Sequence, residues 1–391
     1  MSGGVDSSVA AGLLLRTGHD VVGCFMRLGS PGETLDELVA DGVCESPSAT
    51  GKTVRIGKQG CCSINDAADA RAVAARLGIP LYVCNFKKDF GRIIDYFADE
   101  YARGRTPNPC VRCNDWLKFG KLHEYAAQIG ASIVASGHYA RIEPGPDGTA
   151  RLLRGVDSGK DQSYVLFGAP RERLGGMMFP IGGLPKSRVR ELAREMGLPV
   201  FDKPDSQEIC FVPDRDYAGL VERRRPGVAR EGPVVDRDGR TLGEHGGQHR
   251  FTIGQRRGLS IAAGMPLYVI SKDAATNTVT VGPAEALLIA SCEVGEANWL
   301  CGPPGGAGWH PAMAKYRYNT PAVAARFRVL AAGSGPTPSG RRGRFEVRFD
   351  SPQPAVAAGQ AMVLYSAVEP DVVIGGGWID ATSAMDSGGG A

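Results

Sequence analysis

Two short stretches of the sequence carry the residue types that could do chemistry. Residues 1–8 read "MSGGVDSS", and residues 104–121 read "GRTPNPCVRCNDWLKFGK". The first stretch offers hydroxyls and a carboxylate beside two glycines. The second offers two thiols, Cys110 and Cys113, at CxxC spacing. That spacing alone suits half of a zinc site, a redox switch, part of an iron–sulfur cluster or a sulfur-handling active site.

The opening stretch predicts an anion-binding loop. Gly3 and Gly4 let the backbone wrap around an anion, and Ser7 and Ser8 add hydroxyl donors. The helix that follows supplies backbone N–H groups and the positive end of its dipole. Asp6 could hold a magnesium ion that bridges phosphates. Because the Gly-Lys-Ser/Thr of a Walker A loop is missing, we expect a phosphate site of another class.

The composition is that of a soluble globular enzyme of two or three domains, with 391 residues, 43% hydrophobic and 22% charged. No apolar run approaches the roughly 20 residues of a membrane span, and no leader peptide is evident. We therefore expect a cytosolic protein whose ten cysteines are thiols, ligands or catalysts rather than disulfides. The net charge is only +3, but basic runs beyond residue 220, such as "KYRY" and "GRRGRF", could grip phosphates.

The first part of the chain alternates strand-like and helix-like segments. We expect strands at 20–26, 80–86 and 131–137 and helices at 66–78 and 89–104. Such alternation predicts a doubly wound α/β domain with a parallel sheet. The weakly periodic stretch after the first strand predicts a long excursion loop. A phosphate loop of this kind normally follows a strand. Either the start of the sequence is called late, which we favour, or the fold lacks a strand beside this loop.

Beyond residue 213 the pattern changes to short alternating runs with Asp-Gly and Thr-Asn turns, which predict antiparallel hairpins. From residue 287 the alternation predicts a small β-barrel. We therefore expect an α/β domain at 1–213, a central mainly-β segment at 214–286, a C-terminal β-barrel at 287–381 and a frayed tail at 382–391.

Several motifs together point to a known family. "SGGVDSS" resembles the PP-loop of ATP pyrophosphatases, which split ATP between its α and β phosphates and adenylate a substrate. Further motifs follow in order, among them "TPNPCVRCN", "ASGHYARI", "GVDSGKDQSYVL", "KPDSQEICFVP" and "GQHRFTIGQRRGL". Together they resemble the tRNA-specific 2-thiouridylase family, known as MnmA or TrmU, over nearly the whole chain.

The resemblance implies a function. ATP would adenylate the C2 oxygen of the wobble uridine-34 of a tRNA, which turns a poor leaving group into the departing oxygen of AMP. A sulfur nucleophile would then attack C2. The implied requirements are ATP with Mg²⁺, the anticodon stem-loop of tRNA as partner, and a persulfide-carrying protein or free sulfide as sulfur donor, in the cytoplasm and without a membrane.

The resemblance also implies residue roles. Cys113 aligns with the catalytic nucleophile and Cys210 with the partner that carries persulfide sulfur. Nucleotide contacts would fall on Met1, Ser2, Gly3, Gly4, Val5, Asp6, Ser7, Ser8, Met26 and Gly137. Contacts with tRNA would fall on Asn108, Pro109, Cys110, Lys160, Asp161, Gln162, Lys315 and Tyr316. The family has Arg where this chain has Lys315, and lysine lacks the planar fork of a bidentate contact.

Cys110 is the departure from the family, since many members carry Asp there. A zinc site of Cys110, Cys113, Cys210 and Cys61 or Cys62 would occupy the nucleophile. A redox CxxC would need a thioredoxin-like strand–CxxC–helix context, which the flanking residues do not suggest. Cys110 could instead be a bystander beside a persulfide relay of Cys113 and Cys210. In the hypothesis we favour, Cys110, Cys113 and Cys210 hold a [4Fe–4S] cluster whose fourth iron binds sulfide.

Two rival functions remain open at this stage. A PP-loop amide-forming synthetase of the GMP synthetase kind would not need Cys113, and tRNA would not stimulate its pyrophosphate release. An RNA-binding platform with a defunct nucleotide site would bind tRNA without turning ATP over.

Overall fold

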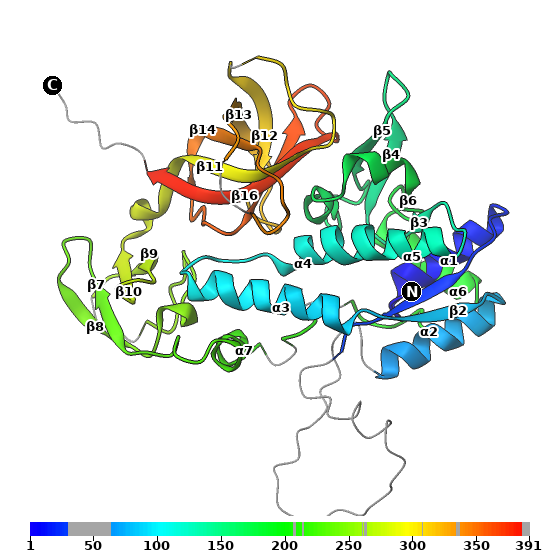
Figure 1. The fold of residues 1–391 in the computed structure, drawn as a ribbon, viewed down its shortest axis with the longest axis horizontal. Helices are drawn as coiled ribbons and strands as arrows, with labels where there is room; N and C mark the ends of the chain where they lie inside the picture. The colour runs from blue at the N-terminus through cyan, green and yellow to red at the C-terminus, as the bar shows by residue number, and fades with distance from the viewer. Residues whose placement is uncertain are drawn as a thin grey trace, which may run out of the picture. The chain divides into compact units, whose positions relative to one another are not determined.

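The computed structural model describes residues 1–29, 64–205, 209–212, 215–259, 261, 264–306, 308–333 and 337–384. They form two compact units, Met1–Arg92 with Lys186–Asp216 and Ile93–Pro185 with Tyr217–Ala391 (Figure 1). Nearly all of the expected excursion loop, with Cys61 and Cys62, lies outside the described residues. The expected division into an α/β domain, a central segment and a barrel domain does not coincide with these two units, and it stays a prediction.

The first unit contains a parallel pair of strands joined through a helix. Strand β1 (Gly23–Arg27) pairs with β2 (Leu81–Asn85), and Met26 lies opposite Cys84. The helices are α1 (Val5–Arg16), α2 (Ile64–Leu77), the first residues of α3 (Lys87–Ala102) and α6 (Lys186–Glu195). Ala11 and Ala74 share a small core with Ile79. Parallel strands with an intervening helix confirm the expected α/β class.

The second unit begins with the helical segment that carries the CxxC pair. After α3 come α4 (Pro109–Arg112), a π-helix (Cys113–Lys121) and α5 (Leu122–Gln128). Strand β3 (Val134–Ala135) pairs in parallel with β6 (Met177–Met178), and β4 (Ala140–Pro144) pairs antiparallel with β5 (Ala150–Arg154). The strand expected at 131–137 is therefore shorter, because only two of its residues find a partner. Two 3₁₀ turns, Ser163–Leu166 and Arg171–Gly176, connect β5 to β6.

The central part of the chain forms a four-stranded sheet that follows α7 (Tyr217–Arg224). Strands β7 (Gly232–Val235) and β8 (Thr241–His245) make one hairpin, and β9 (Tyr268–Asp273) and β10 (Thr278–Gly282) make another. Both hairpins are antiparallel, as the turn residues predicted. Parallel pairing of β7 with β10 joins them, and Val234, Val269 and Val279 form the buried side of the sheet.

The C-terminal strands close into a six-stranded barrel, as predicted, drawn in yellow to red in Figure 1. Its order is β11-β14-β13-β12-β15-β16, and all pairings are antiparallel. The strands are β11 (Leu288–Trp299), β12 (His310–Lys315), β13 (Val323–Leu330), β14 (Arg344–Pro354), β15 (Ala361–Ser366) and β16 (Val373–Ala384). Since β16 runs to Ala384, the first three residues of the expected tail belong to a strand.

The barrel contributes to a second core outside its own interior. Tyr365 and Trp378 from β15 and β16 are buried with Tyr96 of α3, Val111 of α4 and Phe119 of the π-helix. Burying this apolar surface fixes the helical CxxC segment against the barrel within the second unit. In the described part of the chain, no helix has the length and apolar character needed to cross a membrane.

Candidate functional site

The glycine loop has a backbone that other residues could not easily adopt. Gly3 has φ +71°, and a Cβ at this position would lie 2.4 Å from the carbonyl oxygen of Asp66. Gly4 is the N-cap residue of α1, and no side chain caps the helix there. The first N–H groups of a twelve-residue helix are therefore available to an anion. This geometry suits a phosphate and supports the expected loop.

The serines of the loop divide into two roles. Ser8 is buried, and its hydroxyl donates to the Gly4 carbonyl at 2.7 Å, which holds the loop on the helix. Ser2 and Ser7 have their Oγ atoms 3.2 Å apart at an exposed position. Of the predicted nucleotide contacts, Ser2 and Ser7 thus offer hydroxyls to a ligand, whereas Ser8 serves the structure of the loop.

Two lysines that sequence reasoning did not single out hold the loop. Lys186 donates to both carboxylate oxygens of Asp6 at 2.7 and 2.9 Å and pairs with Asp205 at 2.8 Å. Lys203 donates to the carbonyl of Gly3 at 3.0 Å. Their only signal in the sequence was their place inside the motifs "LPKSRV" and "KPDSQE".

The ion pair between Lys186 and Asp6 involves the residue that we predicted to bind magnesium. Asp6 stands beside the loop as expected, but a magnesium ion there would share its carboxylate with the Lys186 ammonium. The same ammonium brings a positive charge to the loop, which complements a phosphate. Magnesium binding by Asp6 therefore stays a prediction.

The remaining predicted nucleotide contacts belong to different units. Met26 is half-buried on β1 in the first unit, as the glycine loop is. Gly137 lies two residues beyond the end of β3 in the second unit, at the carboxyl end of a parallel strand. Ligands of open α/β sheets bind at such strand ends.

The CxxC segment begins with a helix start that the sequence encodes. Asn108 is the N-cap of α4 and its side chain accepts from the Val111 N–H at 3.4 Å, while Pro109 occupies the first helical position. Cys110 is exposed, and the half-buried Cys113 is the first residue of the π-helix. Because π-helical turns are rare and are frequently found at functional sites, this position favours a chemical role for Cys113.

Three contacts anchor the residues around Cys113. Arg112 is only 1% exposed and makes a bidentate ion pair with Glu296 of β11, at 2.7 and 3.0 Å. Asn114 donates to the carbonyl of Val165 at 3.0 Å. Asp115 pairs with Arg341 at 3.2 Å. The nucleophile candidate therefore sits between residues that the barrel side of the unit holds in place.

The predicted tRNA-contacting residues 160–162 differ in their exposure and hydrogen bonding. Asp161 is buried and accepts from the N–H groups of Gly155 and Ser163, and Gln162 accepts from the Tyr139 N–H. Both side chains thus support the local backbone, whereas Lys160 is half-exposed. Contacts of these three residues with tRNA stay predictions.

Lys315 and its aromatic neighbours lie near the CxxC segment within the second unit. The Lys315 ammonium is 5.8 Å from the Tyr164 ring and 5.7 Å from the Tyr318 ring. Burial, and then the negative charges of Asp161 and a Cys110 thiolate, raise the pKa of the Tyr318 hydroxyl. Tyr316 is only 3% exposed in the barrel core, so its burial does not favour a contact with tRNA. Tyr318, 40% exposed, is the aromatic residue that sequence reasoning missed inside "KYRY".

Cys210 lies in a turn of the first unit, whereas Cys110 and Cys113 belong to the second. Within the ranges that the structure describes, no group of three or more His, Cys, Asp or Glu side chains is arranged to hold a metal ion. The described residues therefore give no support to the zinc site or the iron–sulfur cluster considered above. Cys61 and Cys62 are not among them.

His138 is buried next to Gly137. Its Nδ1 lies 2.7 Å from the Ser136 hydroxyl and its Nε2 lies 3.4 Å from the Lys118 ammonium. Burial, and then the charge of Lys118, hold the pKa of His138 well below its ordinary value. The imidazole therefore stays neutral and can accept a hydrogen bond from Lys118.

This neutral imidazole predicts a pH dependence. Below pH about 6.5 His138 binds a proton in the unfolded chain but stays neutral in the folded protein. The free energy of unfolding should therefore decrease as the pH is lowered, by up to about 1.4 kcal/mol per pH unit. We expect His138→Gln to reduce this slope between pH 7 and 5 in urea titrations followed by tryptophan fluorescence. All four tryptophans lie in the second unit, as His138 does. Equal slopes in wild type and variant would contradict the prediction.

Comparisons with known proteins agree along the whole chain. A family model described as tRNA methyl transferase HUP domain matches residues 1–214, one described as tRNA methyl transferase PRC-barrel domain matches residues 223–283, and an aminomethyltransferase beta-barrel domain matches residues 290–379. A tRNA-specific 2-thiouridylase MnmA of Rhodopirellula baltica is 45% identical over 99% of this chain and 96% of its own length. Proteins of the same name from Geobacter metallireducens and Caulobacter vibrioides are 45% and 44% identical, over 99% and 98% of this chain and 97% and 94% of their own.

Proposed function

Because the chain belongs to the tRNA-specific 2-thiouridylase MnmA family, we propose that it converts the wobble uridine-34 of tRNA to 2-thiouridine at the expense of ATP. The observation that carries this proposal is that the same chain contains both a loop suited to the phosphates of ATP and a thiol suited to sulfur transfer. Its first unit presents a glycine loop at an uncapped helix start, and its second presents a half-buried thiol at the head of a π-helix.

The first half-reaction uses the loop. The uridine C2 oxygen attacks the α-phosphorus of ATP, a new O–P bond forms, and the bond to the β-phosphate oxygen breaks with release of pyrophosphate. The N–H groups at the start of α1, together with Ser2 and Ser7, would hold the phosphates. Lys186 would add positive charge, and Mg²⁺ would accompany ATP. The C2 oxygen becomes part of AMP and can then depart.

The second half-reaction uses the cysteines. A persulfide on Cys210 attacks C2 with its terminal sulfur, and the C2–O bond breaks as AMP leaves. The Cys113 thiolate then attacks the inner sulfur, which frees 2-thiouridine and leaves a Cys113–Cys210 disulfide. A thiol reductant must restore both thiols before the next turnover. No step of this proposal passes through an iron–sulfur cluster, since no group of ligands among the described residues supports one.

The sulfur donor and the grip on tRNA complete the proposal. A persulfide-carrying protein charges Cys210: the Cys210 thiolate takes the outer sulfur of the donor's persulfide, and the donor leaves as a thiol. Free sulfide, the other donor considered, would not pass through Cys210 but would attack the adenylated C2 directly as AMP leaves. The central segment at 214–286 holds the anticodon stem-loop, with Tyr318 and Lys315 beside the CxxC segment as candidates for stacking and charge contacts. We place the reaction in the cytoplasm, where tRNA is modified.

The test is tRNA-dependent turnover by cysteine variants. With ATP, Mg²⁺, an unmodified tRNA transcript and a persulfide donor, we expect AMP release and 2-thiouridine. Cys113→Ser and Cys210→Ser should each lower thiolation by at least about 10³-fold. Cys301→Ser, which replaces an exposed cysteine of the second unit, is the matched control and should stay active.

Each rival predicts a different outcome of this assay. Unchanged activity of Cys113→Ser without tRNA stimulation would favour an amide-forming synthetase. Binding of tRNA with no AMP release at saturating Mg²⁺ would favour an RNA-binding platform. Close to four iron and four sulfide per chain in protein purified without oxygen, lost in Cys110→Ala, would replace the persulfide relay by a cluster mechanism.

A further inference from the structure

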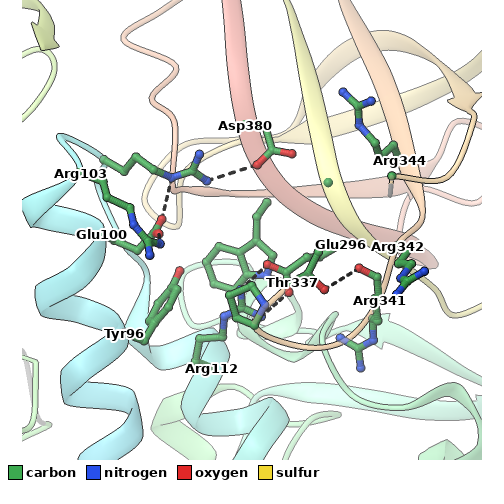
Figure 2. A pocket seen from close by; sticks show the side chains of 15 residues that line it. Tyr96, Glu100, Arg103, Arg112, Glu296, Thr337, Arg341, Arg342, Arg344 and Asp380 are labelled. Carbon is green, nitrogen blue, oxygen red and sulfur yellow. Dashed lines mark hydrogen bonds and ion pairs between the residues drawn. The ribbon is translucent and has the colours of Figure 1, made fainter. Parts of the chain in front are cut away.

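A cavity of about 400 Å³ lies in the second unit, between α3, α4 and one end of the barrel (Figure 2). None of the steps above uses it. Figure 2 shows Arg341, Arg342 and Arg344 on one side of this cavity and Tyr96, Glu100 and Arg103 on the other. Its volume falls in the range of small-ligand sites.

The wall of the cavity carries more positive than negative charge. Six arginines line it, Arg103, Arg105, Arg112, Arg341, Arg342 and Arg344, against three carboxylates, Glu100, Glu296 and Asp380. The lining thus has a formal excess of three positive charges. Such a concentration of guanidinium groups in one concave site creates a field that attracts anions.

The three carboxylates are already engaged by arginines of the same wall. Arg103 and Arg105 pair with Glu100 at 3.3 and 2.7 Å, and Arg105 also pairs with Asp380 at 3.3 Å. Glu296 is held by Arg112 at 2.7 Å. The negative groups are therefore not available to neutralise the remaining arginines.

The remaining three arginines lie on the barrel side. Arg341 pairs with Asp115, and Arg344 pairs with the half-exposed Glu293, neither of which lines the cavity. Arg342 is exposed and makes no ion pair with any described residue. The barrel side thus presents guanidinium groups whose charge is not balanced inside the cavity.

We propose that this cavity is a binding site for a phosphate group. Guanidinium groups match phosphate oxygens with paired hydrogen bonds, which favours phosphate over a simple halide. Two sources of that group arise from the proposed function, on which this inference rests: the pyrophosphate released from ATP, and a backbone phosphate of the bound tRNA.

A phosphate bound in the cavity would change contacts made by residues next to the candidate nucleophile Cys113. Arg112 lines the cavity and directly precedes Cys113 in the chain. Arg341 lines it as well and holds Asp115, two residues beyond Cys113. A phosphate bound between these arginines would compete with Glu296 and Asp115 for the same guanidinium groups.

The test compares two charge-matched double variants. Arg342→Gln with Arg344→Gln removes two cavity arginines, and Arg326→Gln with Arg348→Gln removes two arginines of strands β13 and β14 that do not line it. Pyrophosphate is titrated into each by calorimetry, with a saturating non-hydrolysable ATP analogue to occupy the glycine loop. We expect the cavity variant to lose pyrophosphate affinity by at least about 10-fold and the control to keep it.

A second arm separates the two sources. If the ligand is a tRNA phosphate, pyrophosphate will bind neither protein, and the slope of log affinity for tRNA against log salt will fall by about 1 to 2 in the cavity variant alone. The single variant Arg342→Ala, at an exposed position, repeats both arms should the double variant fold poorly. Unchanged pyrophosphate binding together with an unchanged salt slope would overturn the proposal. Both readouts are binding measurements, so they stand even if thiolation fails.

Discussion

Glu296→Ala is expected to destabilise the second unit by about 3 to 5 kcal/mol, far more than an ordinary carboxylate on a barrel strand would. The reason is that Glu296 is the ion-pair partner of the buried Arg112. Arg112 is 1% exposed, and its guanidinium lies 4.0 Å from the Trp378 ring and 4.8 Å from the Tyr96 ring. Without Glu296 a permanent positive charge would stay buried without the carboxylate that it is hydrogen-bonded to.

We expect Glu296→Ala to slow thiolation as well. Arg112 is the residue before Cys113, and a buried arginine that seeks a new partner would shift the start of the π-helix. Displacement of a reacting group by about 1 Å can cost about 10²-fold in rate, so we expect the thiolation rate constant to fall by that order. The KM for ATP should change little, since the glycine loop belongs to the other unit.

Two comparisons separate this effect from a general loss of charge. Glu293→Ala removes a half-exposed carboxylate of the same strand, paired with Arg344, and should cost less than about 1 kcal/mol. Adding Arg112→Met to Glu296→Ala removes the stranded charge and should recover most of the stability. Tryptophan fluorescence in urea measures all of these, because the four tryptophans report on this unit. Equal losses for Glu296→Ala and Glu293→Ala would refute the argument.

The sequence was sufficient for features that depend on local pattern. The glycines and serines of residues 2–8 indicate the phosphate loop because a tight turn and a helix start need those residue types. Asn108 and Pro109 indicate the start of α4 for the same reason. Alternation of apolar residues from 287 onward indicates the barrel, since strand periodicity is also local.

Pairings between distant residues could not be predicted in this way. Nothing near Arg112 distinguishes it from other arginines until Glu296, 184 positions later, is placed against it. Tyr316 and Tyr318 look alike in "KYRY", yet Tyr316 directly follows β12 and is buried, whereas Tyr318 lies two residues further along and is 40% exposed. Lys186 and Lys203 became visible only when the fold brought them to Asp6 and Gly3.

Gly3→Ala is expected to abolish ATP turnover while a similar change nearby does not. The new Cβ would lie 2.4 Å from the Asp66 carbonyl oxygen, closer than any real contact, so the loop or α2 must move. Movement of the loop disturbs the N–H groups and hydroxyls proposed to hold the phosphates. We expect tRNA-dependent AMP release to fall by at least about 10²-fold.

Gly18→Ala provides the matched control for this prediction. Gly18 lies in the same unit with φ +84°, so alanine there meets the same left-handed backbone penalty of about 1 to 2 kcal/mol. Nothing lies within 4 Å of its added Cβ, however. Thermal melts followed by circular dichroism should show a modest loss for both variants, and only Gly3→Ala should lose AMP release. If both variants keep their turnover, the close approach of the loop to Asp66 is not what shapes the phosphate site. If both lose it, backbone strain in this unit, rather than the loop, limits the reaction.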